Sequence, residues 1–373
     1  MWRTLNLLES FCEGIMRDAV TVLVTGGGAP GIAGTIYSLR YNPDGIQTRI
    51  VACDARDEVV GKYLADAFYV VPPAHHPEFL KEVLRIARKE GVDVILPQVT
   101  RELAIFARGR HYFEDQGIAV AVASNETIAY ANDKWHLSEV AKQINVPVPE
   151  SILVNSHHEI ENAARLLGYP QNKVVVKPRF SHGQRGFRIL TEERWNADRF
   201  FNEKPDATEI SLQNLLAILQ HGSWSGLIVQ EHLPGEEYTV DVFYGHRTAL
   251  AIPRMREELR SGITFKARVV LREDLINYSL ALAQALDLKY AFGFQFKLDA
   301  NGTPKLLECN PRVQGTMVAA TLAGVNVIWY AVREALGEAV QPEELGKPAN
   351  GMRLLRYWGG IAVYADGKTS GPI

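Results

Sequence analysis

The chain has 373 residues, of which 47% are hydrophobic and 22% charged, and its formal net charge is -3. It is long enough for about two or three packed units, and its charge excludes the polycationic surface that binds nucleic acid. No run approaches the roughly 20 apolar residues that cross a bilayer. The cysteines, Cys12, Cys53 and Cys309, have no CxxC spacing, so neither a disulfide framework nor a zinc ribbon is indicated. We expect a cytoplasmic protein without a nucleic acid or membrane partner.

The N-terminal third alternates apolar runs with helical segments. Residues 1–19 mix charged residues with leucines, which spoils the apolar core of a signal peptide and favours a short amphipathic helix. The alternation that follows is typical of βαβ units and a parallel sheet, an α/β fold. The predicted strands are 20–25, 47–53, 68–71, 92–97 and 118–122, with helices that include a segment ending near 41 and 77–90.

A glycine-rich turn, Gly26 to Gly31, ends the first predicted strand, and the second ends at Asp54. This is formally the GxGxxG spacing of a dinucleotide-binding fold, so an NAD(P)-dependent oxidoreductase is one interpretation. Glycines at such a turn serve equally to pack a helix on a strand. We prefer this structural interpretation.

The character of the sequence changes near residue 132. Asn132-Asp133-Lys134 opens a helix that runs to Ile144, and a domain boundary is predicted here. The later part is rich in strands. The predicted strands are 151–154, 173–177, 226–231, 237–244, 247–253, 263–270 and the hairpin 290–309, and the helical segments are 157–167, 191–221, 272–286 and 318–336.

The predicted hairpin near the C-terminal end carries polar groups on one face. Side chains alternate along a strand, so Glu308, Asn310 and Arg312 project to one side, and Leu307 and Cys309 project into the core. The preceding strand has an unbroken apolar face, which indicates a buried strand. An ordinary hairpin with one face in solvent is the alternative.

The turn of this hairpin predicts its register. A two-residue Asn301-Gly302 turn places Gln295 directly opposite Glu308, with Cβ atoms about 5 Å apart. One carboxylate and two amide carbonyl groups, from Glu308, Gln295 and Asn310, can hold Mg²⁺ together with phosphate oxygens and water. The hairpin therefore predicts a metal site.

A lysine and a glycine-rich loop adjoin at the end of a valine-rich strand. Lys177 ends the strand, and the loop 180–186 follows at once. An ammonium group is a compact donor for phosphate oxygens, and the N–H groups of a loop can close over the same charge. Arg312 would add a guanidinium fork. A surface lysine and a solvated turn are the alternatives for each feature alone, but their adjacency predicts a polyphosphate site.

The order of these features resembles the ATP-grasp superfamily, especially its carbamoyl-phosphate-synthase-like members. The similarity spans residues 20 to about 335. It rests on Asn132-Asp133-Lys134, on Val176-Lys177-Pro178-Arg179 with its glycine loop, on the segment from Val229 to Asp241, and on Gln295 with Leu307 to Arg312.

The resemblance implies that ATP lies between two lobes. Lys134 and Lys177 would contact its phosphates. The other residues that would bind the nucleotide are Ser181, Gly183 and Gly186 in the phosphate loop, Glu231, His232 and Leu233 at the adenine, and Glu237 at the ribose.

The resemblance also implies the metal and substrate residues. Gln295, Glu308 and Asn310 would ligate one or two Mg²⁺ or Mn²⁺ ions, and Arg312 would face the transferred phosphate. The catalytic candidates implied are Arg312 and Lys177, with Arg254 and Lys266 as weaker candidates on the substrate side.

The same resemblance implies the domain organisation. An N-terminal extension (1–19) would precede a Rossmann-like pre-ATP-grasp domain (20–130), a small lobe (131–230) and a large lobe with the C-terminal segment (231–373). The chain departs from the family at Ser181 and Gln184, where Gly and Ser are common, and at Cys309, where an aliphatic residue is usual. We expect Cys309 to be a small core residue rather than a nucleophile.

The activity implied is that of an ATP-dependent ligase. ATP and Mg²⁺ would convert a carboxylate into an acyl phosphate, which an amine then attacks, with release of ADP and phosphate. Bicarbonate or carbamate is one candidate acid, and a homodimer is the default expectation. The other interpretations are an oxidoreductase using the turn at 26–31 and a non-catalytic ATP-binding module that regulates a partner.

Overall fold

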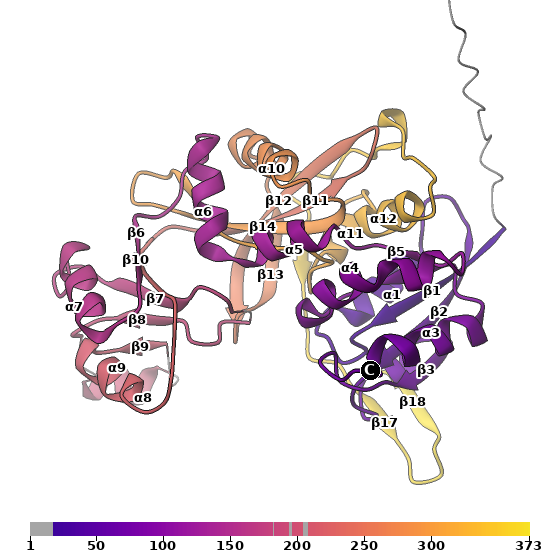
Figure 1. Ribbon diagram of the computed structural model, residues 1–373, viewed down its shortest axis with the longest axis horizontal. Helices are drawn as coiled ribbons and strands as arrows, with labels where there is room; N and C mark the ends of the chain where they lie inside the picture. Colours follow the sequence, from indigo (N-terminus) through magenta and orange to yellow (C-terminus); the bar gives the residue numbers. More distant parts are fainter. Residues whose placement is uncertain (1–17, 182, 194–195, 204–207) are drawn as a thin grey trace, which may run out of the picture.

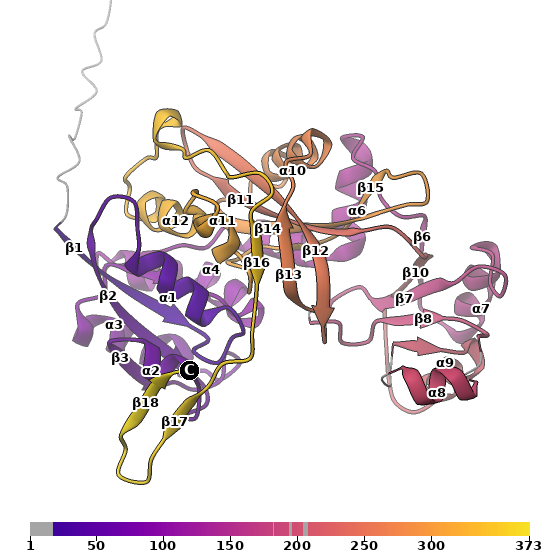
Figure 2. The same cartoon turned by 180° about the vertical axis from the view of Figure 1, so that it is seen from behind.

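The computed structural model describes residues 18–181, 183–193, 196–203 and 208–373 (Figure 1). The amphipathic helix predicted within residues 1–19 lies, except for its last two residues, outside these ranges. A parallel sheet and a six-stranded antiparallel sheet lie side by side, and a smaller sheet projects from the opposite end of the molecule (Figures 1 and 2). The predicted α/β fold with a parallel N-terminal sheet is confirmed.

The N-terminal unit is a parallel sheet of order β3-β2-β1-β4-β5. The order of the strands reverses between β1 and β4, so loops diverge there at the carboxyl edge of the sheet. Its strands are β1 (Ala19–Thr25), β2 (Gln47–Asp54), β3 (Ala67–Val70), β4 (Val94–Leu96) and β5 (Ala119–Val120). Its helices are α1 (Ile32–Arg40), α2 (Gly61–Leu64), α3 (Phe79–Glu90), α4 (Thr100–Glu114) and α5 (Asn125–Asn132).

The small lobe is a mixed sheet of order β6-β10-β7-β8-β9 with a hydrophobic core of its own. Helix α6 (Lys134–Gln143) leads into it from the N-terminal unit. Its strands are β6 (Ser151–Val154), β7 (Val174–Pro178), β8 (Arg188–Leu190), β9 (Glu209–Ile210) and β10 (Leu227–Glu231), and its helices are α7 (His157–Leu166), α8 (Ala197–Asn202) and α9 (Leu212–Leu219). The segment 191–221, predicted as helical, therefore also contains a short strand.

The large lobe is an antiparallel sheet of order β15-β14-β11-β12-β13-β16. Its strands are β11 (Glu237–Tyr244), β12 (Ala249–Arg260), β13 (Ile263–Val269), β14 (Tyr290–Leu298), β15 (Pro304–Asn310) and β16 (Arg353–Leu355). Helices α10 (Glu273–Ala285), α11 (Val318–Leu322) and α12 (Val327–Ala335) accompany it. A short 3₁₀ turn (Pro342–Glu344) follows, and the hairpin of β17 (Ile361–Val363) and β18 (Thr369–Pro372) projects from the body in Figures 1 and 2.

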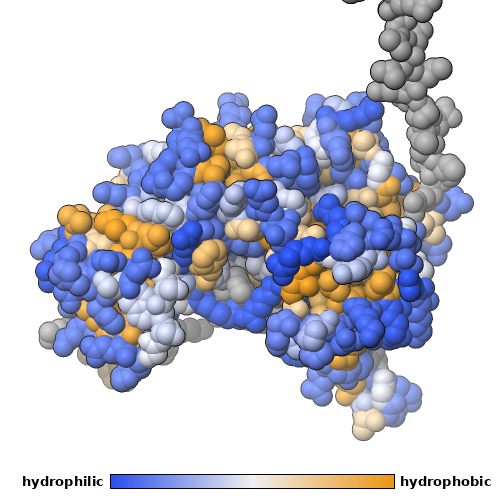
Figure 3. Space-filling view, viewed as in Figure 1, coloured by the Kyte–Doolittle hydropathy of each residue, from blue (hydrophilic) through white to orange (hydrophobic). Residues whose placement is uncertain are grey.

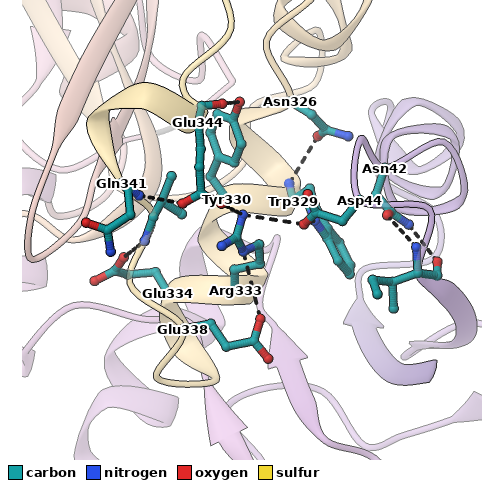
Figure 4. A network of polar contacts seen from close by, with 12 residues as sticks. Asn42, Asp44, Asn326, Trp329, Tyr330, Arg333, Glu334, Glu338, Gln341 and Glu344 are labelled. Carbon is teal, nitrogen blue, oxygen red and sulfur yellow. Dashed lines mark hydrogen bonds and ion pairs between the residues drawn. The ribbon is translucent and has the colours of Figure 1, made fainter. Parts of the chain in front are cut away.

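The N-terminal unit and the large lobe share one hydrophobic cluster, centred on α1, α11 and α12. A polar network borders this cluster (Figure 4). The indole nitrogen of Trp329 donates to Asp44 at 2.6 Å, and Arg333 lies 3.4 Å from the same carboxylate. The Asn326 amide donates to the carbonyl oxygen of Ser38 at 2.7 Å. The hydrophobic core of the small lobe is separate from this shared cluster.

The hairpin of β14 and β15 has the predicted pairing at the end away from its loop. Gln295 is opposite Glu308. The predicted two-residue turn, however, is wrong: the Asp299 N–H donates to the Thr303 carbonyl oxygen at 3.0 Å, which makes a three-residue loop with Gly302 at φ 80°. A bulge at Leu307 then restores the register, so the two departures cancel.

The bulge also changes where Leu307 points. We predicted that Leu307 projects into the core, but it lines the cavity described below, and Leu306 is the buried residue. A bulge adds one residue to the strand and so shifts the alternation of its faces. Cys309 is buried, as predicted. Cys53 is also a free and buried cysteine.

Replacement of Cys309 by valine should leave the protein folded and active. The thiol is packed among apolar side chains of the large lobe, and burial raises its pKa well above the ordinary value. The thiol therefore remains protonated and acts as a small hydrophobic group. We expect the free energy of unfolding in urea to change by less than about 1.5 kcal/mol. A loss of ATP turnover in a normally stable variant would instead indicate a chemical role for the thiol.

Candidate functional site

A cavity of about 1220 Å³ lies where the N-terminal unit, the small lobe and the large lobe meet. On the face seen in Figure 3, the molecule is hollowed between the small lobe and the N-terminal unit. The predicted site residues that line the cavity are Lys134, Lys177, Ser181, Gly183, His232, Leu233, Glu237, Gln295, Glu308, Asn310 and Arg312. The predicted residues outside this lining are Gly186, Glu231, Arg254 and Lys266.

Two lysine side chains, from α6 and β7, contact residues of β15 in the cavity wall. Lys134 is the first residue of α6, and its ammonium group donates to the Ser181 carbonyl oxygen at 2.6 Å and lies 3.6 Å from Glu308 Oε2. Lys177, on β7, reaches the carbonyl oxygen of Leu307 at 3.4 Å. The helix start is fixed by Asp133, whose carboxylate caps α6 and pairs with Arg179. Two cations thus face one carboxylate.

Burial lowers the pKa of Lys177 to about 8. The second cause is the positive charge of Lys134, and Glu308 opposes both. Two ammonium groups held close together repel each other, and an anion with several negative charges would relieve that repulsion. The arrangement is therefore suited to a polyanion.

The candidate metal ligands lie together on the hairpin. Asn310 Nδ2 donates to Glu308 Oε1 at 3.2 Å, and Gln295 lies across the strand pair. Among the residues that the structure describes, no group of three or more His, Cys, Asp or Glu side chains is arranged for a metal ion. One carboxylate and two amides are too few for a tightly resident metal, but they fit Mg²⁺ that is shared with phosphate oxygens.

Arg312 joins the hairpin to the N-terminal unit. Its guanidinium group donates to Asn310 Oδ1 at 3.3 Å, to Thr100 Oγ1 at 3.0 Å and to the carbonyl oxygen of Val313 at 2.9 Å. Thr100 is the first residue of α4. Close packing adds a second contact, since a Cβ atom on Gly31 would meet the Gly315 Cα at 2.7 Å. The N-terminal unit therefore forms one wall of the site.

The predicted nucleotide residues divide into two groups. His232 and Leu233 line the cavity, and Glu237 also lines it while paired with Arg256. The carboxylate of Glu231 instead accepts hydrogen bonds from the Glu150 N–H at 2.8 Å and from Lys305 at 2.5 Å, outside the lining.

The two weaker candidates for the substrate side are not in the cavity wall. Lys266 is half exposed and pairs with Glu258 at 2.6 Å, because it is on the outward face of β13. Arg254 is fully buried and makes a two-point contact with Asp241, at 2.7 and 3.2 Å. Its guanidinium group also donates to Oε1 of Gln314, which lines the cavity, at 3.4 Å.

Asp54, the acidic residue beside the glycine turn, accepts backbone hydrogen bonds with both of its carboxylate oxygens. One Asp54 oxygen accepts from the Gly28 N–H at 2.8 Å and the other from the Arg56 N–H at 3.0 Å. These two hydrogen bonds hold the carboxylate against the backbone of the turn and of the strand end. Asp54 therefore has a structural role in fixing the turn.

Sequence reasoning missed several residues of the wall. Arg256 donates to Thr264 Oγ1 at 2.8 Å and to the Gly262 carbonyl oxygen at 2.6 Å, and it lines the cavity. Its spacing of two from Arg254 on one strand was an available signal. The segment 97–102 is among the loops expected to form the substrate pocket, but Gln98 and Glu102 were not singled out within it because the loop carries no motif.

Two family models match the chain. Residues 22–121 match the model described as "PylC-like, N-terminal domain", and residues 223–357 match the model described as "ATP-grasp in the biosynthetic pathway with Ter operon". The carbamoyl phosphate synthase large chain of Clostridium acetobutylicum is 25% identical over 282 residues, which cover 72% of this chain. The chain spans about a quarter of that relative, 24% of its length.

Solved structures share the fold. The N5-carboxyaminoimidazole synthetase of Staphylococcus aureus, complexed with ADP, superposes with a TM-score of 0.64 at 16% identity, over 88% of this chain and 80% of that one. The biotin carboxylase domain dimer of the Hydrogenobacter thermophilus 2-oxoglutarate carboxylase, in complex with MgADP, ADP and bicarbonate, gives 0.64 at 20% identity, over 87% and 72%.

The resemblance predicted from the sequence is confirmed, and the chain has the fold of the ATP-grasp superfamily. Its N-terminal unit is similar to the PylC-like N-terminal domain, and the chain is similar in sequence to a carbamoyl phosphate synthase large chain. In the described part of the chain, no helix combines the length and the apolar character needed to cross a membrane.

Proposed function

We propose that this protein is an ATP-dependent ligase that activates a carboxylate as an acyl phosphate for attack by an amine. The observation that carries the proposal is the meeting of Lys134, Lys177 and Arg312 with the oxygen donors of Gln295, Glu308 and Asn310 in one cavity. Cations beside metal-binding oxygens suit a nucleotide triphosphate. The family matches support the same class of reaction.

Charge neutralisation and positioning would carry the chemistry. Lys134 and Lys177 bind the phosphates, and Arg312 faces the phosphoryl group that is transferred to the carboxylate. Gln295, Glu308 and Asn310 would hold Mg²⁺, which would supply further positive charge near the phosphates. Gly183 and its neighbours in the phosphate loop exclude water, which would otherwise hydrolyse the acyl phosphate. No covalent enzyme nucleophile is required.

A hydroxamate screen tests this function. Protein, ATP, Mg²⁺ and hydroxylamine are incubated with a library of carboxylates that includes bicarbonate, and hydroxamate and ADP are measured. A ligase yields ADP with every active acid and hydroxamate with every organic one, and both signals need Mg²⁺. ATP binding with neither product from any acid would favour a regulatory ATP-binding module.

The oxidoreductase alternative is separated by a binding measurement. NADH or NADPH added to the protein should show no enhancement of fluorescence if the turn from Gly26 to Gly31 serves only to pack a helix on a strand. A saturable enhancement would reopen that interpretation. The control is the same titration with Mg-ATP present, which should leave the signal unchanged.

The affinity for Mg-ATP should fall as the pH rises through about 8. Lys177 has a pKa of about 8 in the free protein, so it is charged below this pH and neutral above it. Only the charged form attracts phosphate, and the dissociation constant should therefore increase about tenfold between about pH 7 and pH 9. Calorimetry measures it. In Lys177→Met the binding should be weaker and this added dependence absent, and an unchanged slope in that variant would assign the titration to another group.

A further inference from the structure

Two buried polar side chains of the N-terminal unit line the cavity without protein partners for one atom each. Gln98 is 6% exposed and Glu102 is 8% exposed. Within the described ranges, neither Gln98 Nε2 nor Glu102 Oε2 has a hydrogen-bond partner. A buried polar atom left unpaired costs about 1–3 kcal/mol, so two together in a cavity wall indicate a ligand.

The rest of this pair is fixed. Thr35 Oγ1 donates to Gln98 Oε1 at 3.2 Å, and the Gln98 N–H donates to Thr25 Oγ1 at 3.1 Å. Thr25 also hydrogen-bonds the Glu102 carboxyl group. The orientation of both side chains is therefore set before a ligand binds, with an amide N–H group and a carboxyl oxygen left over.

The pair lies at the point where the order of the sheet reverses. Thr25 ends β1, and Gln98 and Glu102 follow β4, which is its neighbour on the other side of the reversal. Ligands of open α/β sheets bind in the crevice at such a point. The same place is the wall that faces the large lobe.

Two contacts join this wall to the part of the cavity where Arg312 lies. Arg312 hydrogen-bonds Thr100, which is one helical half-turn before Glu102. Gly31 packs on Gly315, and its carbonyl oxygen accepts from the Thr35 N–H, the residue that holds Gln98. A molecule at Gln98 and Glu102 would therefore adjoin the residue that faces the transferred phosphate.

We propose that Gln98 and Glu102 bind the nucleophilic substrate, and that this substrate is a primary amine with a carbonyl or carboxylate oxygen close to it, the class of the amino acids. This inference rests on the proposed ligase function. Glu102 Oε2 accepts from the amino group, and Gln98 Nε2 donates to the oxygen. Arg56, Arg101 and His75 line the same cavity and favour an anionic group on the ligand.

The charge state of Glu102 agrees with an amine ligand. The pKa of its carboxyl group is raised to about 7, chiefly by burial and to a lesser extent by the charge of Asp54, and the hydrogen bond with Thr25 acts against both. In the described part of the chain, no lysine or arginine forms an ion pair with Glu102. A bound ammonium group would supply the missing positive charge and restore an ionised carboxylate.

The test is a binding panel on Glu102→Gln. The probes are the twenty standard amino acids, ammonium chloride and ethylenediamine, measured by calorimetry with Mg-ADP present. We expect at least one amino acid to bind the unaltered protein. Its dissociation constant for the variant should be at least about tenfold higher. Glu114→Gln is the matched control on the same helix, because Glu114 is exposed and lies 3.7 Å from Arg110; it should bind the probe normally.

The outcomes separate this site from the proposed function. Mg-ATP affinity and the melting temperature should be the same in Glu102→Gln and the unaltered protein, which shows that the variant is folded. Equal binding of the amino acid to both proteins overturns the site, and so does the absence of binding by every amino acid. If an amino acid binds through Glu102 but no acid gives ADP or hydroxamate, the binding site stands and the ligase proposal fails.

Discussion

Glu308→Ala is expected to lose ATP turnover almost completely. Glu308 is the carboxylate of the candidate metal set, and its oxygens also lie 3.2 Å from Asn310 and 3.6 Å from Lys134. The variant would leave two amides as metal ligands and two ammonium groups without their shared anion. Loss of charge stabilisation of this kind lowers turnover by about 10²–10³-fold. ADP release in the hydroxamate assay measures the effect.

Glu258→Ala is the matched control for that variant. Glu258 is on the same sheet but pairs with Lys266 away from the cavity, so its loss should leave turnover within about twofold. Raising the Mg²⁺ concentration should restore part of the activity of Glu308→Ala if the ion is shared with the nucleotide. Normal turnover by Glu308→Ala would remove the hairpin from the site and with it the proposed mechanism.

The long periodic elements could be predicted from the sequence. Strand β11 was predicted with its observed bounds, and β6 likewise, because alternating or continuous apolar runs bounded by turn residues identify strands. Helix α4 was missed. Gly109 weakens its helical pattern, but a Cβ atom there would meet Leu80 Cδ1 at 2.3 Å, so glycine permits the close packing of α4 on α3. Tertiary packing outweighed propensity at this point.

The candidate metal set could be predicted because it depends on one local hairpin. Counting from the turn gave the correct pairing of Gln295 with Glu308 even though the loop has three residues, since the bulge at Leu307 compensates for it. The position of Leu307 was wrong for the same reason. A bulge has no reliable sequence signal, because it is set by the twist and the packing of neighbouring strands.

The loops 26–31 and 97–102 of the N-terminal unit were expected near the substrate pocket, but the individual residues of this wall could not be predicted. Gln98 and Glu102 meet Thr25 only because β1 and β4 are neighbours in the sheet, and strand order across such a distance is not encoded in a local pattern. Arg254 was placed on the substrate side through a family resemblance. Its partner Asp241 comes from the neighbouring strand, and only the register of β11 with β12 shows that the two side chains meet below the cavity.

Arg254→Met is expected to destabilise the protein strongly. Arg254 and Asp241 are 1% and 0% exposed and form a two-point ion pair. Removal of the guanidinium group leaves the Asp241 carboxylate buried without a partner, which costs about 3–5 kcal/mol of the free energy of unfolding. Urea unfolding followed by circular dichroism measures the loss.

The double variant Asp241→Leu with Arg254→Met decides whether Arg254 has a chemical role. When both charges of a buried pair are replaced by apolar groups of similar size, stability is often recovered. We expect the double variant to unfold near the midpoint of the unaltered protein and to retain its Mg-ATP affinity, because Arg254 is not part of the cavity lining and contacts it through Gln314. A stable double variant with a normal KM for ATP but an increased KM for the carboxylate would mean that Arg254 orients Gln314 toward the substrate, as a positioning residue. A stable double variant with unchanged constants would make the pair purely structural, and the substrate side of the site would then be formed by the residues that line the cavity itself.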